Sequence, residues 1–258
     1  MRIALLADVG VRSTTFAEEI GRITVFASRL CGAAVRRPLR MRRFVDEVFY
    51  LGVLSLVIIC VCGLAVGAVL GLQGYNTLER FGATDALGTV VGLSLIRELG
   101  PVLTALLTTG RAGSATTAEI GTMVATEQLD GLRMMSIDPL HYVVMPKALA
   151  MVFVMPLLSA LFIVCGITGG YLVGVYWGVD PGSYITSLET AVTFWDEVVG
   201  SLLKSLCFGI LVGLIATYRG YFSAPTSQGV SSATTATVVQ ASVSILIFDY
   251  FITALWGV

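Results

Sequence analysis

Two charged side chains, Arg97 and Glu98, interrupt a stretch that otherwise has the composition of a membrane-spanning helix. The flanking segments 86–96 and 99–110 contain no charged residue. Together they are about long enough to cross a hydrocarbon core of about 30 Å at about 1.5 Å per residue. A charge at that depth costs about 3 kcal/mol on insertion scales, so such residues face protein or water and are functional candidates.

The next residue with a special backbone is Pro101, which has no N–H and therefore leaves the carbonyl of Arg97 without its helical partner. A kink just after the charges is expected. Adjacent helical residues point about 100° apart, so Arg97 and Glu98 each need a partner elsewhere. Lys204 and Asp249 interrupt later apolar stretches and are available as partners.

The composition is that of an integral membrane protein. Of the 258 residues, 56% are hydrophobic and 13% are charged, and the mean hydropathy is +0.87. Soluble domains have about 25% charged residues. Every element predicted below is a helix, so the expected fold class is all-α.

The scarcity of reactive side chains excludes several kinds of chemistry. The two lysines, Lys147 and Lys204, do not follow the glycine of a Walker A loop, so the chain cannot hydrolyse ATP by that mechanism alone. The single histidine, His141, has no catalytic partner at a recognisable spacing and is interpreted as an interfacial residue. The five cysteines form no CxxC pair, which predicts neither disulfides nor a zinc site. We therefore expect no catalytic residue, metal or cofactor in this chain.

Five uncharged or nearly uncharged stretches predict five transmembrane helices. They cover residues 48–72, 86–110, 148–179, 198–217 and 236–257. The first 45 residues contain nine arginines, and further basic residues follow the second and fourth stretches. By the positive-inside rule, the N-terminus is predicted to be cytoplasmic and the C-terminus to lie on the opposite side of the membrane.

A basic amphipathic helix is predicted before the first span, which divides the chain into residues 1–45 and a five-span domain, 46–258. Apolar residues recur there at spacings of three and four: Phe16, Ile20, Ile23, Ala27, Leu30 and Ala34. Arginines recur every seven residues beside this stripe, which is typical of a helix lying on a membrane surface. The alternative is an ordinary helix packed in the bundle.

Glycines at every fourth position predict close helix packing. They are Gly63, Gly67 and Gly71 in the first span, and Gly166, Gly170, Gly174 and Gly178 in the third. Packing within one chain is favoured for at least one of these rows, with packing between two copies as the alternative.

The segment 111–147 between spans two and three is predicted to contain a helix with a short apolar face edged by acids. The apolar residues are Leu129, Leu132 and Met135, and the acids are Glu119, Glu127 and Asp130. Such a helix can dock into a partner's groove. A solvated loop helix is the alternative.

Several motifs in and around these segments resemble those of the MlaE permease family. They are RELGPVLTA at 97–105, GRAGSA at 110–115, AEIGTM at 118–123, TEQLD at 126–130 and Asp138-Pro139. Two positions depart from the family pattern, Gly131 in place of alanine and Ser136 in place of glycine. The basic N-terminal segment and the pattern of spans extend the resemblance over nearly the whole chain.

The resemblance implies a permease subunit of an ABC transporter that moves phospholipids between the inner membrane of a Gram-negative bacterium and a periplasmic carrier, contributing to outer-membrane lipid asymmetry. It implies a homodimer with a separate ATPase that binds ATP, a STAS-domain regulator and a periplasmic MCE-domain hexamer, and no nucleic acid. It also implies that the docking segment is an ATPase-coupling helix. The residues assigned to coupling are Glu119, Thr126, Glu127, Gln128, Leu129, Asp130 and Leu132.

A lipid carrier needs an apolar cavity and a polar site for the headgroup, since each buried methylene contributes about 0.8 kcal/mol. We hypothesise that Arg97 or Lys204 lies near the phosphate and that Glu98 balances the charge. The residues expected to contact acyl chains are Leu70, Leu78 and Leu99. Alternatively, Arg97 and Glu98 only hold helices together, Lys204 extends to the interface, and Asp249 makes a helix-locking hydrogen bond. An ion- or solute-coupled secondary transporter remains the alternative function, although no inverted repeat is visible.

Overall fold

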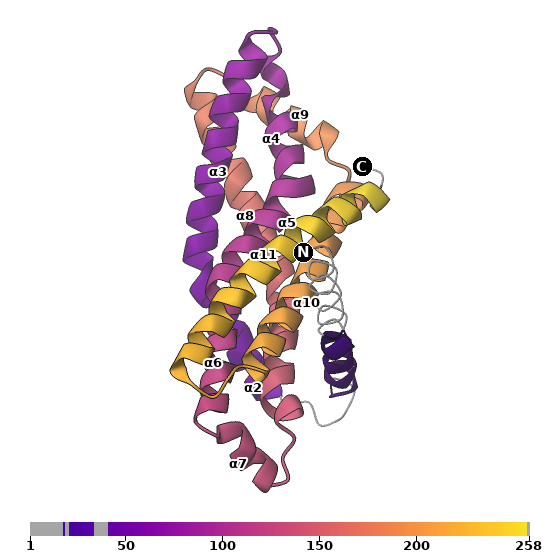
Figure 1. The fold of residues 1–258 in the computed structure, drawn as a ribbon. Helices are drawn as coiled ribbons and strands as arrows, with labels where there is room; N and C mark the ends of the chain where they lie inside the picture. Colours follow the sequence, from indigo (N-terminus) through magenta and orange to yellow (C-terminus); the bar gives the residue numbers. More distant parts are fainter. Residues whose placement is uncertain (1–17, 19–20, 34–40, 257–258) are drawn as a thin grey trace, which may run out of the picture.

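Long helices make up almost all of the computed structural model, which describes residue 18, residues 21–33 and residues 41–256 (Figure 1). Within these residues, five helical rods are long and apolar enough to cross a membrane. They are Met41–Glu79, Thr84–Ala125, Leu140–Tyr176, Phe194–Tyr221 and Ser227–Leu255. The prediction of an all-helical, five-span protein is therefore confirmed, and each rod begins before the uncharged stretch that predicted it.

The rods are built from α-helices joined by short π-helical segments. The α-helices are α2 (Met41–Val48), α3 (Leu54–Glu79), α4 (Leu87–Ser94), α5 (Gly100–Thr108), α6 (Ser114–Ala125), α7 (Gln128–Met134), α8 (Met145–Tyr176), α9 (Pro181–Ala191), α10 (Gly200–Tyr221) and α11 (Ser227–Trp256). The wider segments are η1 (Phe49–Val53), η3 (Leu95–Leu99), η4 (Thr109–Gly113), η5 (Leu140–Val144) and η6 (Phe194–Val199), and η2 (Thr84–Ala86) is a tighter 3₁₀ turn. Helix α2 continues into the first rod and crosses the predicted division between residues 45 and 46.

The distortion expected at Pro101 takes the form of the π-helical segment η3 directly before it. The backbone N–H of Gly100 donates to the carbonyl of Leu95, five residues back. Pro101 lies in the first turn of α5, where the missing N–H costs least. The π-helical turn thus carries the rod past the proline while both charged residues, Arg97 and Glu98, lie inside η3.

Helices α3 and α8 pack with their backbones almost in contact. A Cβ added at Gly71 would lie 2.9 Å from the carbonyl oxygen of Gly170, and one added at Gly67 would collide with the backbone of Gly166. The glycine rows of the first and third spans therefore face each other within one chain, as favoured from the sequence.

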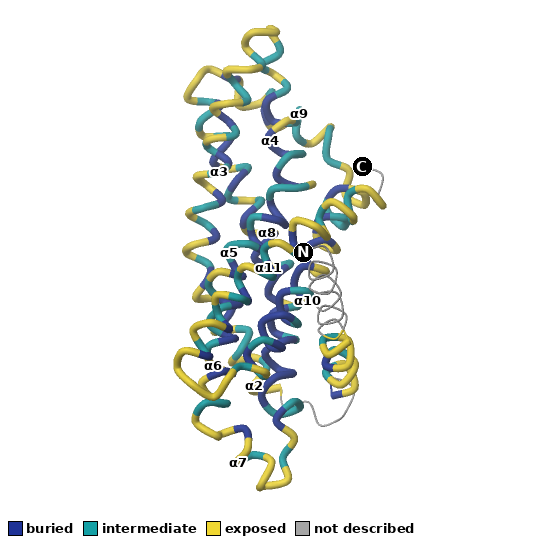
Figure 2. The backbone as a smooth tube through the Cα atoms, in the orientation of Figure 1, coloured by how far each residue is buried: buried dark blue, intermediate teal, exposed yellow. Residues whose placement is uncertain are grey.

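Helix α11 has the smallest fraction of buried residues in its most apolar stretch among the five rods. It crosses the bundle obliquely (Figure 1), and Figure 2 shows exposed residues along much of its length. Of its most apolar stretch only 11% of the residues are buried, against 44% in Thr84–Ala125. Its exposed side chains are largely apolar, including Val239, Val243 and Leu246. Helix α11 therefore presents an extensive apolar surface to its surroundings.

The N-terminal amphipathic helix is described over residues 21–33, where it packs against the end of α10. Phe26 is buried, and its ring contacts the rings of Tyr218, Tyr221 and Phe222 at centroid distances of 5.6, 5.8 and 5.9 Å. Of the predicted stripe, Ile23, Ala27 and Leu30 are half-buried, and Phe16, Ile20 and Ala34 lie outside the described residues. Location on a membrane surface stays a prediction.

Candidate functional site

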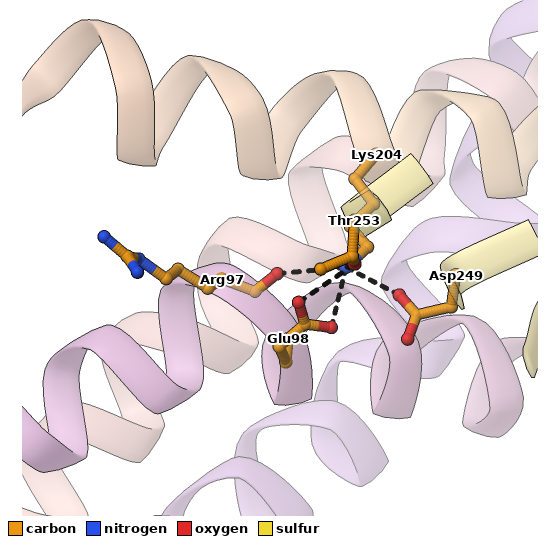
Figure 3. Close-up of polar contacts among 5 residues, drawn as sticks. All are labelled: Arg97, Glu98, Lys204, Asp249 and Thr253. Carbon is orange, nitrogen blue, oxygen red and sulfur yellow. Dashed lines mark hydrogen bonds and ion pairs between the residues drawn. The ribbon is translucent and has the colours of Figure 1, made fainter. Parts of the chain in front are cut away.

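Lys204 on α10 is the centre of a polar cluster inside the helical bundle (Figure 3). Its ammonium nitrogen lies 2.7 Å from Glu98 Oε2, 2.6 Å from Asp249 Oδ1 and 2.9 Å from Thr253 Oγ1. It also donates to the carbonyl of Arg97 at 3.2 Å, which is the carbonyl that Pro101 leaves without a helical partner. Thr253 donates in turn to Glu98 Oε1 at 3.0 Å. The cluster therefore joins η3, α10 and α11 through one buried lysine.

The side chain of Arg97 belongs to a second, adjoining ion pair. Its Nε and one terminal nitrogen donate to the two carboxylate oxygens of Glu197, at 2.7 and 2.5 Å. This two-bond geometry is the strongest form of arginine–carboxylate contact. Figure 3 shows the guanidinium pointing away from Lys204. The side chain of Arg97 is 40% exposed whereas that of Glu197 is 6% exposed, so Arg97 is the cation of this site that a ligand can reach.

A small cavity lies between these two ion pairs. Its volume is about 40 Å³, and its lining includes Arg97, Glu98, Asp196, Glu197, Ser201, Lys204 and Thr253. A water molecule needs about 10–15 Å³ of such space, so the cavity holds water or one small polar group. It has no room for an acyl chain. Any apolar chamber must therefore be completed by surfaces outside this cavity.

The site brings together three charged residues that the sequence analysis had named and adds two residues that it had not. Glu98, Lys204 and Asp249 come together as expected, and Asp249 forms an ion pair rather than only a hydrogen bond. Glu197 and Thr253 were not singled out. Both had a spacing signal: Glu197, Ser201 and Lys204 share one helix face, and Thr253 follows Asp249 by four residues.

Lys204 differs from its predicted role in one respect. We expected Arg97 or Lys204 to be near a phosphate, with Lys204 extending to the interface as the alternative. Lys204 is buried and all its N–H donors face oxygen atoms of this chain, so it does not extend to the interface. Of the two residues expected near the phosphate, Arg97 therefore remains the candidate, and phosphate binding by Arg97 stays a prediction.

The predicted acyl-chain residues do not line the small cavity. Leu70, Leu78 and Leu99 are half-buried and pack against the apolar core of the bundle. Their partly exposed surfaces leave contact with lipid open, and that contact stays a prediction.

The predicted coupling residues divide between α6, α7 and the sharp turn that joins these helices. Glu127 occupies this turn with φ 56°, a left-handed conformation. Thr126, Glu127, Gln128 and Asp130 are exposed. Glu119 lies on α6 and pairs with buried Lys147 at 2.8 Å, which also binds Glu47 at 2.7 Å. These residues thus offer both an exposed turn and a link to α2 and α8.

Two of the three residues of the predicted apolar face of α7 pack against their own chain. Leu129 is buried among Ile120 and Val143, and Leu132 is half-buried against the same cluster, so both stabilise the attachment of α7 to its own chain. The exposed apolar residues are Met134, with 89% exposure, and Met135, with 63%. Amphipathic spacing identifies an apolar stripe but not which protein covers it.

Arg133 fastens α7 to the end of α10. It donates to Asp130 Oδ1 at 2.6 Å and to the Tyr221 hydroxyl at 2.7 Å. The hydrogen bond that Arg133 donates to Tyr221 raises the pKa of Arg133 above its ordinary value, so Arg133 is charged at every physiological pH.

Comparisons with known proteins agree with the resemblance in the motifs. A family model described as "Permease MlaE" matches residues 44–255. The intermembrane phospholipid transport system permease protein MlaE of Haemophilus influenzae is 46% identical over 99% of this chain and 98% of its own length. A probable ABC transporter permease protein of Rickettsia bellii is 39% identical over 99% of both chains. The chloroplast protein TRIGALACTOSYLDIACYLGLYCEROL 1 of Arabidopsis thaliana is 28% identical over 90% of this chain and 66% of its own length. This five-span chain, with its buried lysine–carboxylate cluster, belongs to the MlaE permease family.

Proposed function

We propose that this chain is the membrane permease subunit of an ABC transporter that moves phospholipids between the inner membrane and a periplasmic MCE-domain carrier, and thereby contributes to outer-membrane lipid asymmetry. The observation that carries the proposal is the cluster around Lys204 and Arg97, which places ion pairs and a reachable guanidinium inside an apolar bundle. The name of the Haemophilus influenzae relative supports phospholipid as the cargo. Intramembrane charges of this kind mark substrate pathways.

In this proposal, Arg97 binds the phosphate of the lipid. The guanidinium is planar and matches phosphate geometry, and the bonds to Glu197 hold it in a fixed orientation. Its exposed edge remains available to a phosphate oxygen. Glu98 balances the charge of Lys204, and Leu70, Leu78 and Leu99 contact the acyl chains beyond the polar cluster.

The chamber for the tails is proposed to form in a homodimer. The cavity of one chain, about 40 Å³, is far too small for two acyl chains. Helix α11 contributes Ile252 and Thr253 to this cavity and exposes most of its apolar surface. A second copy placed against α11 would enclose an apolar space beside the charged cluster.

ATP hydrolysis is proposed to take place in a separate cytoplasmic subunit. The sequence lacks a Walker A lysine, and relatives are named ABC transporter permeases. The exposed turn at Thr126–Asp130 and the exposed Met134 and Met135 form the proposed contact with that ATPase. A STAS-domain regulator and a periplasmic MCE-domain hexamer complete the proposed assembly. The N-terminus is cytoplasmic and the C-terminus periplasmic in this arrangement.

The test is reconstitution of the permease with its ATPase and MCE partner in liposomes that contain a fluorescent phospholipid. We expect ATP-dependent lipid transfer, and we expect Arg97→Ala to reduce the lipid bound per complex and the transfer rate. The matched control is Arg80→Ala, since Arg80 is exposed at the far end of α3. Transfer and bound lipid that are the same in both variants would exclude the phosphate role of Arg97.

The same reconstitution separates the alternative of an ion- or solute-coupled transporter. That alternative predicts activity that disappears with an ionophore and persists without ATP. In the proposed mechanism, Met134→Ser with Met135→Ser weakens ATPase retention during purification, because the contact surface loses its apolar side chains. Both side chains are exposed, so we expect the fold itself to be unchanged. Undiminished retention would place the ATPase contact elsewhere.

A further inference from the structure

A second cavity lies at the opposite part of the molecule, where α2 meets the beginning of the third rod. Its volume is about 220 Å³, and it is lined by Met41, Phe44, His141, Met145, Pro146, Leu149 and Phe153. All but one of these residues are apolar. Helix α2 lies toward the end of the molecule that bears α7 (Figure 1), which is cytoplasmic in the proposed orientation. The cavity therefore lies at the level where a membrane's hydrocarbon meets its headgroups on that side.

The cavity continues into a lipid-facing stripe on α8. Phe153 lines the cavity and is exposed, and its ring packs edge-on against Phe44 at a centroid distance of 5.5 Å. Leu157, Leu161 and Val164 are exposed at spacings of three and four beyond it, so they share its helix face. An acyl chain that enters the cavity can extend along this stripe toward the bilayer centre.

Positive charge concentrates at the rim of the cavity. Arg42 and Arg43 lie between Met41 and Phe44, which line the cavity. The guanidinium of Arg43 lies 3.8 Å from the centre of the Tyr142 ring and donates to its hydroxyl at 2.7 Å. This contact is a cation–π contact with a hydrogen bond and not an ion pair, so it does not compensate the charge of Arg43.

Arg42 and His141 add donors on the same rim. Within the described part of the chain, Arg42 is exposed and forms no ion pair or hydrogen bond. His141 Nδ1 lies 3.0 Å from the carbonyl of Ala33. A carbonyl only accepts, so Nδ1 carries the proton, and Nε2 is the nitrogen left for a ligand. Of the nearby acids, Glu47 is bound to Lys147, and Asp46 is exposed.

We propose that this cavity is a binding site for an anionic glycerophospholipid of the cytoplasmic leaflet, separate from the transport site around Arg97. One acyl chain occupies the cavity and the stripe on α8, and Arg42 and Arg43 bind the phosphate. Clusters of basic residues directly cytoplasmic to a membrane helix attract anionic lipids by about 1 kcal/mol per residue. An apolar pocket beneath such a cluster adds a fixed position for the chain, so the lipid is held rather than merely attracted. The proposal depends on the cytoplasmic placement of α2 and not on lipid transport.

The experiment is native mass spectrometry of the full-length chain purified in detergent and titrated with dioleoyl phosphatidylglycerol or dioleoyl phosphatidylcholine. We expect tighter retention of phosphatidylglycerol. Arg42→Gln is expected to weaken that retention about fivefold, the factor that corresponds to about 1 kcal/mol. Arg80→Gln is the control with the same charge change at the other end of the first rod.

A second pair of variants tests the apolar half of the site. Leu149→Trp fills the cavity and is expected to abolish the preference for phosphatidylglycerol, whereas Leu172→Trp, on an exposed part of the same helix, leaves it unchanged. Equal retention of the two lipids by the unmodified chain would overturn the proposal, as would equal effects of Arg42→Gln and Arg80→Gln. Loss of ATP-dependent transfer with this preference intact would count against the proposed function alone.

Discussion

At the scale of single residues, the position of Lys204 explains why charges persist inside an apolar bundle. Pro101 leaves the carbonyl of Arg97 without a helical donor, and the ammonium of Lys204 donates to it while forming ion pairs with Glu98 and Asp249. Each group would be costly alone in this environment. Together they satisfy one another, which makes the cluster a structural joint as well as a candidate ligand site.

Replacing the lysine should therefore affect stability. Lys204→Met leaves Glu98 and Asp249 without their counter-charge, and we expect a loss of about 2–3 kcal/mol in unfolding free energy. This is less than for a fully buried pair because the Glu98 side chain is 41% exposed, so water screens part of the charge. Thermal unfolding in detergent measures the loss. Lys204→Arg keeps the charge and should lose less. A Met variant as stable as the unmodified protein would contradict the importance of the ion pairs.

Tyr184 on α9 makes stability depend on pH at the alkaline end. Its ring is buried, and this burial raises the pKa of its hydroxyl to about 12, whereas an unfolded tyrosine ionises near pH 10. The fold thus favours the neutral phenol, so this contribution is complete below about pH 10 and is lost as the pH rises toward 12.

Tyr184→Phe removes this titration, and the hydroxyl makes only a long hydrogen bond of 3.4 Å to the Ile167 carbonyl. We expect near-normal stability at pH 7 and a smaller loss between pH 10 and 12 than in the unmodified protein. Chemical unfolding across that range is the measurement. Parallel pH profiles for the two proteins would show that Tyr184 does not titrate in this way.

At the scale of helices, the contact between α3 and α8 depends on glycine. Gly67→Ala places a methyl group into the backbone of Gly166, so the two helices must separate. We expect a loss of about 1–3 kcal/mol, typical of overpacking. Unfolding in detergent measures it.

The matched control for that change is Gly131→Ala on α7, where no atom lies within reach of the added methyl group. Alanine there should stabilise the helix by up to about 1 kcal/mol, because glycine is the weaker helix former. If both variants behaved alike, helix propensity rather than close packing would govern the Gly67 position.

Periodicity predicted the helices well and their surroundings less well. The five spans were recognisable from uncharged stretches, but the first three rods continue past a charged residue at one end, at Glu47, Arg111 and Lys147, since backbone hydrogen bonds do not stop where the bilayer does. The stripe containing Leu129 was visible, but its burial against Ile120 was not. Glu197 was overlooked as the partner of Arg97 because it directly precedes the predicted fourth span, 198–217, whereas in the structure that rod already begins at Phe194.

At the scale of the whole molecule, α11 is the exposed apolar surface on which the proposed homodimer depends. The proposed homodimer predicts that Val243→Trp, on exposed α11, lowers the fraction of dimer, because the bulky ring obstructs a close contact. Leu157→Trp on exposed α8 is the control. Mass photometry of the purified protein gives the dimer fraction. Equal dimer fractions in both variants would move the interface away from this part of α11.

The ammonium of Lys204, which belongs to the fourth rod, is bonded to the second and fifth rods at a single point. While those bonds persist, that point acts as a pivot: the three rods can tilt about it but cannot slide past one another. A movement that starts at α7 would then tilt the three rods about Lys204. The displacement would be smallest at the lysine and largest at the ends of the rods.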